Sequence, residues 1–282
     1  MKKKMMTIAL GLMVAACNSE QSTPDTLTPS KAITFDCMGD FIFHSFTRAL
    51  TADGKDMTDL WILDYMDGSL HAQFHQSSTD ADFGQPTLDL DYGSHTLYFV
   101  ASRGAGAAVD TDAHTITFSR VLDTFWKTCT ITVSASSANS RTVSLDRVVT
   151  KLRLQFTDAI PSSTATINIT PATWYYGIDY LDGSPVASTS GQAISVNIPA
   201  SDIGFTGEVI SIFGFSAAAE WTTNVSVDSK KADGTILGQA EIIAVPLRRN
   251  RVTEFSGPLY DKTRAMAITL NASWDDSYSG TW

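Results

Sequence analysis

The chain has 282 residues and a formal net charge of −10 at neutral pH, with 20 Lys and Arg against 30 Asp and Glu. This acidic balance argues against a nucleic-acid-binding protein, whose surface needs clustered basic residues. The length exceeds the ~100 residues of a typical single β-sandwich, so we predict two domains.

The first residues have the three parts of a secretory signal peptide. Three lysines at 2–4 precede an apolar run over 5–14, and the sequence VAAC ends this segment at Cys17. The apolar run is about half of the ~20 residues that a helix needs to cross a bilayer. VAAC also matches the bacterial lipobox, in which the Cys thiol takes a diacylglycerol and becomes the first mature residue. We therefore expect a signal peptide over 1–16 and a lipid anchor on Cys17.

A polar segment separates this signal from the first strand-like residues. Residues 18–30 (NSEQSTPDTLTPS) contain two prolines and show no apolar periodicity. Such a composition does not form a packed core, so residues 17–30 are predicted to be a flexible tether that carries the lipid.

Short apolar segments bounded by turn residues then indicate a first β-sandwich over 31–138. The run LWILDY at 60–65 ends at Asp67-Gly68, a strong hairpin signal, and 70–74 is its predicted partner strand. A short helix is predicted near 119–126. The other predicted strands of this domain are 32–35, 41–43, 95–101, 115–118 and 129–133.

A second β-sandwich is predicted over 139–282. The small polar segment SASSANS at 134–140 indicates the boundary between the domains. The segment 148–156 (VVTKLRLQF) alternates apolar and polar residues, as a half-buried strand does. The other predicted strands are 165–169, 174–176, 193–198, 208–215, 222–227, 240–246, 251–259 and 266–274. The predicted fold class is therefore all-β.

Two cysteines remain once Cys17 carries the lipid. Cys37 and Cys129 lie on an early and a late predicted strand of the first domain. In an exported protein they are candidates for one disulfide, and the alternative is that both are small buried apolar side chains. Their spacing does not match a metal site.

The sequence offers no catalytic or metal-binding motif. His71 and His75 have a spacing that would suit a metal on a helix, but their segment is predicted to be a strand and no Glu follows His71. We expect these histidines to face solvent. Because no G-x-S-x-G motif occurs either, we predict a protein that is not an enzyme and uses no cofactor or metal.

Aromatic residues suggest an alternative binding role. Trp174, Tyr176 and Trp221 could stack on sugar rings, or they could pack in the core. On a strand, alternate side chains point to opposite faces, so of the run at 174–176 only Trp174 and Tyr176 share a face. Core packing is the favoured interpretation of the two.

Five features in order resemble the fimbrillins of type V pili in Bacteroidales and their tip and anchor proteins. A lipobox with a polar tether precedes the strand AITFDCMGDFIF and Thr47-Arg48-Ala49. The segments that follow are LWILDYMDGSL, GSHTLYFVA, LDRVVTKL at 145–152, and VPLRRNRVT at 245–253 with GPL at 257–259. The resemblance covers nearly the whole chain.

This resemblance implies two transthyretin-like β-sandwiches and a role in building pili. In such subunits a trypsin-like protease cuts after an Arg and removes the first strand, and a strand of another subunit fills the groove by β-strand addition. Mapped onto this sequence, the cut would fall between Arg48 and Ala49. Residues 32–43 would be the displaced strand, and Met266–Trp274 would be the donor strand or the last strand of the second domain.

The expected function is therefore that of a surface lipoprotein, either a structural subunit or an anchor of a type V-like pilus. Its expected partners are other pilus subunits, the outer membrane through the lipid on Cys17, and a host or bacterial surface ligand. The expected location is the outer membrane, the fimbrium or both. A disulfide between Cys37 and Cys129 would retain the first strand after cleavage and favour an anchor. The alternative function is a surface glycan-binding lipoprotein of an outer-membrane uptake system.

Overall fold

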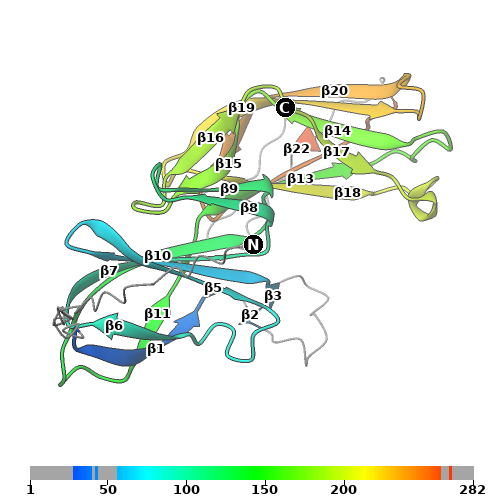
Figure 1. Ribbon diagram of the computed structural model, residues 1–282. Helices are drawn as coiled ribbons and strands as arrows, with labels where there is room; N and C mark the ends of the chain where they lie inside the picture. Colours follow the sequence, from blue (N-terminus) through cyan, green and yellow to red (C-terminus); the bar gives the residue numbers. More distant parts are fainter. Residues whose placement is uncertain (1–27, 40–41, 44–55, 262–266, 269–282) are drawn as a thin grey trace, which may run out of the picture.

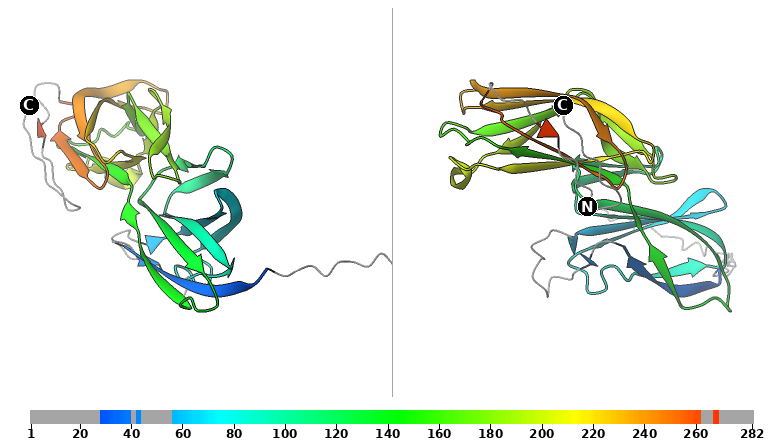
Figure 2. Two further views of the ribbon diagram at one scale, coloured as in Figure 1. Left: turned by 90° about the vertical axis from the view of Figure 1, so that its left-hand side faces the viewer. Right: turned by 180° about the vertical axis from the view of Figure 1, so that it is seen from behind.

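The computed structural model describes residues 28–39, 42–43, 56–261 and 267–268. The predicted all-β fold is confirmed: within these residues the secondary structure is β apart from one short 3-10 turn, η1 (Ala200–Asp202). The strands form two lobes, one below the other in the first view (Figures 1 and 2). Among the described residues, no helix has the length and apolar character needed to span a membrane.

The first lobe is a sandwich of a three-stranded and a five-stranded sheet. The small sheet has the order β11 (Ser140–Ser144), β1 (Ser30–Met38) and β6 (Thr87–Asp91). The large sheet has the order β12 (Asp146–Arg147), β10 (Thr124–Val133), β7 (Gly93–Ser102), β4 (Asp59–Met66) and β5 (Ser69–Ser77). A short parallel pair, β2 (Ile42–Phe43) and β3 (Asp56–Met57), accompanies them.

Strand β4 is buried on both faces, which explains its continuous apolar sequence. Leu60 and Ile62 pack between the two sheets, whereas Trp61 and Leu63 point to the opposite side. The predicted hairpin with β5 is confirmed. Its turn has Asp67 at φ 52° and Gly68 at φ 80°, the two positive values that a tight hairpin turn between twisted strands requires.

The second lobe is a sandwich of two four-stranded sheets. One has the order β18 (Val209–Phe215), β13 (Val149–Phe156), β21 (Val252–Gly257) and β22 (Ala267–Ile268). The other has the order β17 (Ile194–Asn197), β14 (Thr166–Pro171), β19 (Trp221–Lys230) and β20 (Ile236–Leu247). Leu152, Leu154 and Phe156 of β13 point into the core between them, as the alternating sequence predicted.

A third sheet connects the two lobes. It has the order β16 (Pro185–Thr189), β15 (Trp174–Asp179), β9 (Thr115–Arg120) and β8 (Ala105–Asp110). The β8–β9 hairpin belongs to the stretch between β7 and β10 and lies between the lobes in Figure 1, where β9 pairs antiparallel with β15. Beneath this sheet lies a separate buried cluster, which we call the junction core. It comprises Trp61, Leu63, Tyr65, Val100, Ile116, Phe118, Val121, Val148, Val149, Ile178, Tyr180 and Phe215.

Polar contacts of the VPLRRNRVT segment also hold the lobes together. Arg147 of β12 donates to both carboxylate oxygens of Asp123, at 2.7 and 3.0 Å, and to Asn250 Oδ1 at 3.1 Å. Asn250 has a left-handed φ of 57°, which places this turn against β12. Arg249 donates to the carbonyls of Ser216 and Gly183. This segment therefore has a structural role at the junction.

Two details differ from the sequence-based expectations. The helix predicted near 119–126 is wrong: β9 continues to Arg120 and β10 begins at Thr124, because Thr124 pairs with Ser102 of β7. Strands β11 and β12 pair within the first sandwich, although they follow the predicted boundary after residue 138. Where the chain divides into independently folding units stays a prediction.

Candidate functional site

The first strand, β1, is the centre of the three-stranded sheet. It pairs in parallel with β11 and antiparallel with β6, so both of its backbone edges are occupied. Its alternate residues Ile33, Phe35 and Cys37 point into the core and are 4%, 0% and 6% exposed. Phe35 packs on Phe99 of β7 with ring centroids 5.5 Å apart. Removing this strand would thus open a groove with an apolar floor.

Side-chain hydrogen bonds also attach β1 to β6 and to the segment that precedes β11. Lys31 Nζ donates to the carbonyls of Ala135, at 3.0 Å, and Ser137. The hydroxyls of Thr34 and Thr87 lie 2.8 Å apart across the pair with β6. Without β1, strands β6 and β11 would each present a row of unpaired backbone groups, which is the surface that an added strand satisfies.

A fully buried His–Asp pair joins the large sheet to the small one. His95 Nδ1 lies 2.8 and 3.0 Å from the two carboxylate oxygens of Asp64, and both side chains are 0% exposed. His95 Nε2 lies 2.8 Å from the carbonyl of Asp91, at the end of β6. A carbonyl only accepts, so Nε2 donates. A hydrogen bond between Nδ1 and the carboxyl group needs a second proton between them, bound either to the ring or to the carboxyl group. In both cases the charges of His95 and Asp64 sum to zero.

The two cysteines face each other across the first sandwich. Cys37 lies on β1 and Cys129 on β10, and both thiols are free in the structure. Burial raises the pKa of Cys37 to about 12, and the nearby Asp36 and Cys129 add to this shift. Burial also raises the pKa of Cys129, against an opposing effect of Arg141. Both residues contact the core, and the disulfide between them stays a proposal.

We expect iodoacetamide to label Cys129 before Cys37 in the native protein purified without a reductant. At pH 8 only roughly one Cys37 thiol in ten thousand is a thiolate, the reactive form, and that side chain is 6% exposed. Because burial favours the neutral thiol, Cys37 contributes fully to the stability of the folded state below pH 9. This contribution is lost as the pH rises towards 12. Peptide mass spectrometry after timed labelling measures the order. Faster labelling of Cys37 would contradict it, and labelling of neither thiol until a reductant is added would indicate the disulfide.

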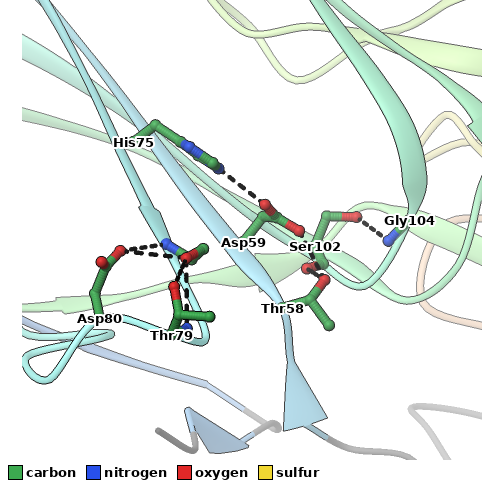
Figure 3. Close-up of polar contacts among 8 residues, drawn as sticks. Thr58, Asp59, His75, Thr79, Asp80, Ser102 and Gly104 are labelled. Atoms are coloured by element: carbon green, nitrogen blue, oxygen red, sulfur yellow. Dashed lines mark hydrogen bonds and ion pairs between the residues drawn. The ribbon is translucent and has the colours of Figure 1, made fainter. Parts of the chain in front are cut away.

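The predicted histidines lie on β5, a strand as expected. His75 Nε2 is 2.9 Å from Asp59 Oδ1 (Figure 3). The imidazole also stacks on Trp61, with ring centroids 5.1 Å apart. The other oxygen of Asp59 accepts from Thr58 Oγ1 at 2.8 Å. This pair resembles the base and orienting acid of a catalytic triad. Among the described residues, however, no Ser, Thr or Cys side chain is hydrogen-bonded to His75 in the position of a nucleophile.

His71, the other predicted histidine, is half-exposed and lies 3.4 Å from a carboxylate oxygen of Asp91. Within residues 28–39, 42–43, 56–261 and 267–268 no cluster of three His, Cys, Asp or Glu side chains suits a metal ion.

The aromatic residues that suggested sugar stacking belong mostly to the core. Trp174 is 1% exposed, and its Nε1 donates to the carbonyl of Phe213 at 3.0 Å. Gly214 lies directly against the indole, where any Cβ would collide with it. Trp221 is half-buried, donates to Ser216 Oγ at 2.8 Å and meets the Tyr175 ring edge-on. Core packing, the favoured interpretation, is therefore confirmed for Trp174.

Several predicted site residues lie outside the described residues. These are the lipidation site Cys17 and the cleavage site at Arg48 and Ala49. Of the predicted donor segment 266–274 the structure describes two residues, which form β22. That strand pairs antiparallel with β21, at Phe255↔Ile268 and Ser256↔Ala267, in the second sandwich.

The fold is shared with solved proteins from Bacteroides. A proposed polysaccharide-binding protein of Bacteroides thetaiotaomicron has a TM-score of 0.53 and 9% identity, covering 88% of this chain and 98% of that one. A proposed adhesin of the same species has a TM-score of 0.51 and 11% identity, covering 86% and 97%. The fimbrial anchor protein Mfa2 of Porphyromonas gingivalis has a TM-score of 0.45 and 9% identity, covering 89% and 100%. No family model and no curated protein matches the sequence.

Proposed function

We propose that the protein is a lipid-anchored surface protein that helps to build a type V-like pilus, as a structural subunit or as the anchor, through β-strand addition. The role is one of assembly and adhesion rather than catalysis. The observation that carries the proposal is the position of β1. It is the first strand of the chain's first sandwich, and its loss would leave an apolar groove between two unpaired strand edges.

The shared fold supports the same role. It extends over almost the full length of the Bacteroides proteins, one of which is described as an adhesin. In the fimbrillins that the sequence resembles, the first strand leaves after proteolysis and a strand of a neighbouring subunit replaces it. A chain with a lipobox Cys17 before β1 and Arg48 after it has both parts of such a device in the required order.

The residues around the groove indicate which contacts an incoming donor strand would make. An incoming strand would form backbone hydrogen bonds with β6 and β11 and place alternate apolar side chains where Ile33, Phe35 and Cys37 lie now. The segment MAITLNASW at 266–274 alternates in the required way. We propose it as the donor to a neighbouring subunit, in competition with the pairing of β22 on β21.

We expect a trypsin-like protease to cut the full-length precursor after Arg48. N-terminal sequencing of the large fragment should then begin at Ala49, and the Arg48→Ala variant should stay intact. Arg264→Ala is the matched control, because Arg264-Ala265 repeats the dipeptide, and it should be cut at Arg48 like the wild type. A fragment beginning elsewhere, or equal cutting of Arg48→Ala, would overturn the assignment.

The same digest tests strand addition. Native mass spectrometry should show that the cut protein loses the fragment ending at Arg48 and binds a synthetic peptide with the sequence of residues 266–274. The uncut Arg48→Ala variant provides the comparison and should not bind the peptide. If the cut protein keeps its first strand under reducing conditions and does not bind the peptide, the proposal of β-strand addition at this groove is wrong.

A disulfide between Cys37 and Cys129 would decide between the two pilus roles. It would join β1 covalently to β10, so that cleavage at Arg48 could not release the strand. We propose that a linked form acts as an anchor and a reduced form as an exchangeable subunit. Non-reducing mass spectrometry of protein isolated from the outer membrane distinguishes the two, since free thiols there would remove the basis for an anchor.

A further inference from the structure

A small pocket lies beside the junction core, where strand β7 meets the β4–β5, β8–β9 and β15–β16 turns. It encloses about 320 Å³. Ser94, Thr96 and Tyr98 line it from one face of β7, because alternate residues of a strand share a face. The turn between β4 and β5 contributes Asp67, and the turn between β8 and β9 contributes His114. We call this cavity the tyrosine pocket.

The pocket rests on a rigid aromatic floor. The Tyr65 ring meets the rings of Tyr98 and His114 edge-on, at centroid distances of 5.5 and 6.1 Å. Its hydroxyl lies 2.9 Å from that of Tyr180, which is fully buried. Tyr65 and Tyr180 thus satisfy each other, and their packing in the junction core fixes the more exposed Tyr98 and His114.

The polar side chains around this floor have no hydrogen-bond partner in the described part of the protein. Within the described part of the chain, no side-chain hydrogen bond or ion pair is made by Asp67, Ser94, Thr96, Tyr98 or His114. In the buried His95–Asp64 pair, by contrast, every ring nitrogen has a partner. Burial and the nearby Tyr65 and Asp179 raise the pKa of Tyr98, so its hydroxyl stays protonated at neutral pH and can both donate and accept.

We propose that the tyrosine pocket binds a neutral saccharide. Aromatic faces combined with several hydroxyls, a carboxylate and an imidazole are the groups that contact the apolar face and the hydroxyls of a sugar ring. The volume is at the lower end of the range for small-molecule sites, which suits a short glycan or the end of a longer one. Asp67 lies in the pocket and the chain is acidic overall, with a net charge of −10, so an acidic sugar is disfavoured.

This inference goes beyond the proposed pilus role and does not depend on cleavage or strand exchange. The pocket uses β4, β7 and the β8–β9 turn, whereas the exchange concerns β1, β6 and β11. Sugar binding by a chain that the protease does not cut at Arg48 would support this inference and contradict only the cleavage assignment, so the two proposals fail separately.

The test is saturation-transfer NMR on the full chain. The probes are galactose, mannose and N-acetylglucosamine, with galacturonic acid and tetramethylammonium as acidic and cationic comparisons. At least one neutral sugar should bind, and Asp67→Asn and Tyr98→Phe should each weaken it about tenfold. Both changes are nearly isosteric, and Asn tolerates the left-handed φ of position 67 as well as Asp does.

Asp233→Asn is the matched control, because Asp233-Gly234 is also an exposed Asp-Gly turn, with its carboxylate bonded to Thr235 and far from the pocket lining. It should bind the sugar like the wild type. The proposal is overturned if none of the three neutral sugars binds, or if both pocket variants bind sugar as well as the wild type does. A preference for galacturonic acid or tetramethylammonium over the neutral sugars would also overturn it. Circular dichroism confirms that each variant is folded.

Discussion

The Asp64→Ala variant is expected to lose about 3–5 kcal/mol of unfolding free energy, because it leaves a buried imidazole without the carboxylate that shares its proton. Both side chains of the pair are 0% exposed, so water cannot replace the lost partner. The pair also positions His95 Nε2 on the carbonyl of Asp91, which ends β6. The loss should therefore weaken the contact between the two sheets. Urea unfolding followed by tryptophan fluorescence measures it.

The chain provides a matched control for this change. Asp59 and His75 form the same kind of pair on the neighbouring strands β4 and β5, at 2.9 Å, but with side chains 26% and 44% exposed. Asp59→Ala should therefore cost only about 0–1 kcal/mol. If Asp59→Ala and Asp64→Ala had equal effects, burial would not be what makes the inner pair important. Additive effects of Asp64→Ala and His95→Ala would show that the two residues do not act as a unit.

The Phe35→Ala variant is expected to destabilise the first sandwich by about 3–5 kcal/mol, since it removes a fully buried ring and leaves a cavity. The ring packs on Phe99 across the sandwich, and thus contributes to holding β1 in place. After cleavage, the variant should release its first strand faster than the wild type. Denaturant unfolding of the uncut protein gives the stability, and timed native mass spectrometry of the cut protein gives the rate of release.

Met38→Ala is the control on the same strand. Met38 is 49% exposed, so its truncation should change stability by less than about 1 kcal/mol and leave strand release unchanged. A Phe35→Ala effect no larger than that of Met38→Ala would mean that β1 is not anchored by its inward side chains. In that case its backbone pairing alone would retain it.

Local patterns were sufficient to predict much of the fold. The alternation in 148–156 and the Asp67-Gly68 turn after LWILDY each carry the information for one element within a few neighbouring residues. Strand β9 was predicted at 115–118, but neither β8 nor the pairing of β9 with β15 was predicted. That contact joins residues about 60 positions apart, and neither strand encodes its partner in its own periodicity.

The candidate sites likewise divide into those that neighbouring residues predict and those that depend on contacts between distant strands. The position of β1 before Arg48 can be read from the sequence, whereas the His95–Asp64 pair and the tyrosine pocket depend on how β4 and β7 align. One signal for the pair was present. Asp64 interrupts an apolar run at a position whose alternation points inward, and a carboxylate there needs a buried partner. For the pocket no comparable signal exists, since its residues come from β7 and from turns that lie far apart in the sequence.

The pairing of β9 with β15 has a mechanical consequence. If the lobes were joined only by the chain between them, a pulling force would first stretch that linker. Here the load passes through the backbone hydrogen bonds of the third sheet and through the junction core, where Trp61, Phe118 and Phe215 pack together. Extending the molecule therefore requires breaking a sheet and exposing apolar surface to water. Under tension both lobes would therefore respond as one mechanical unit.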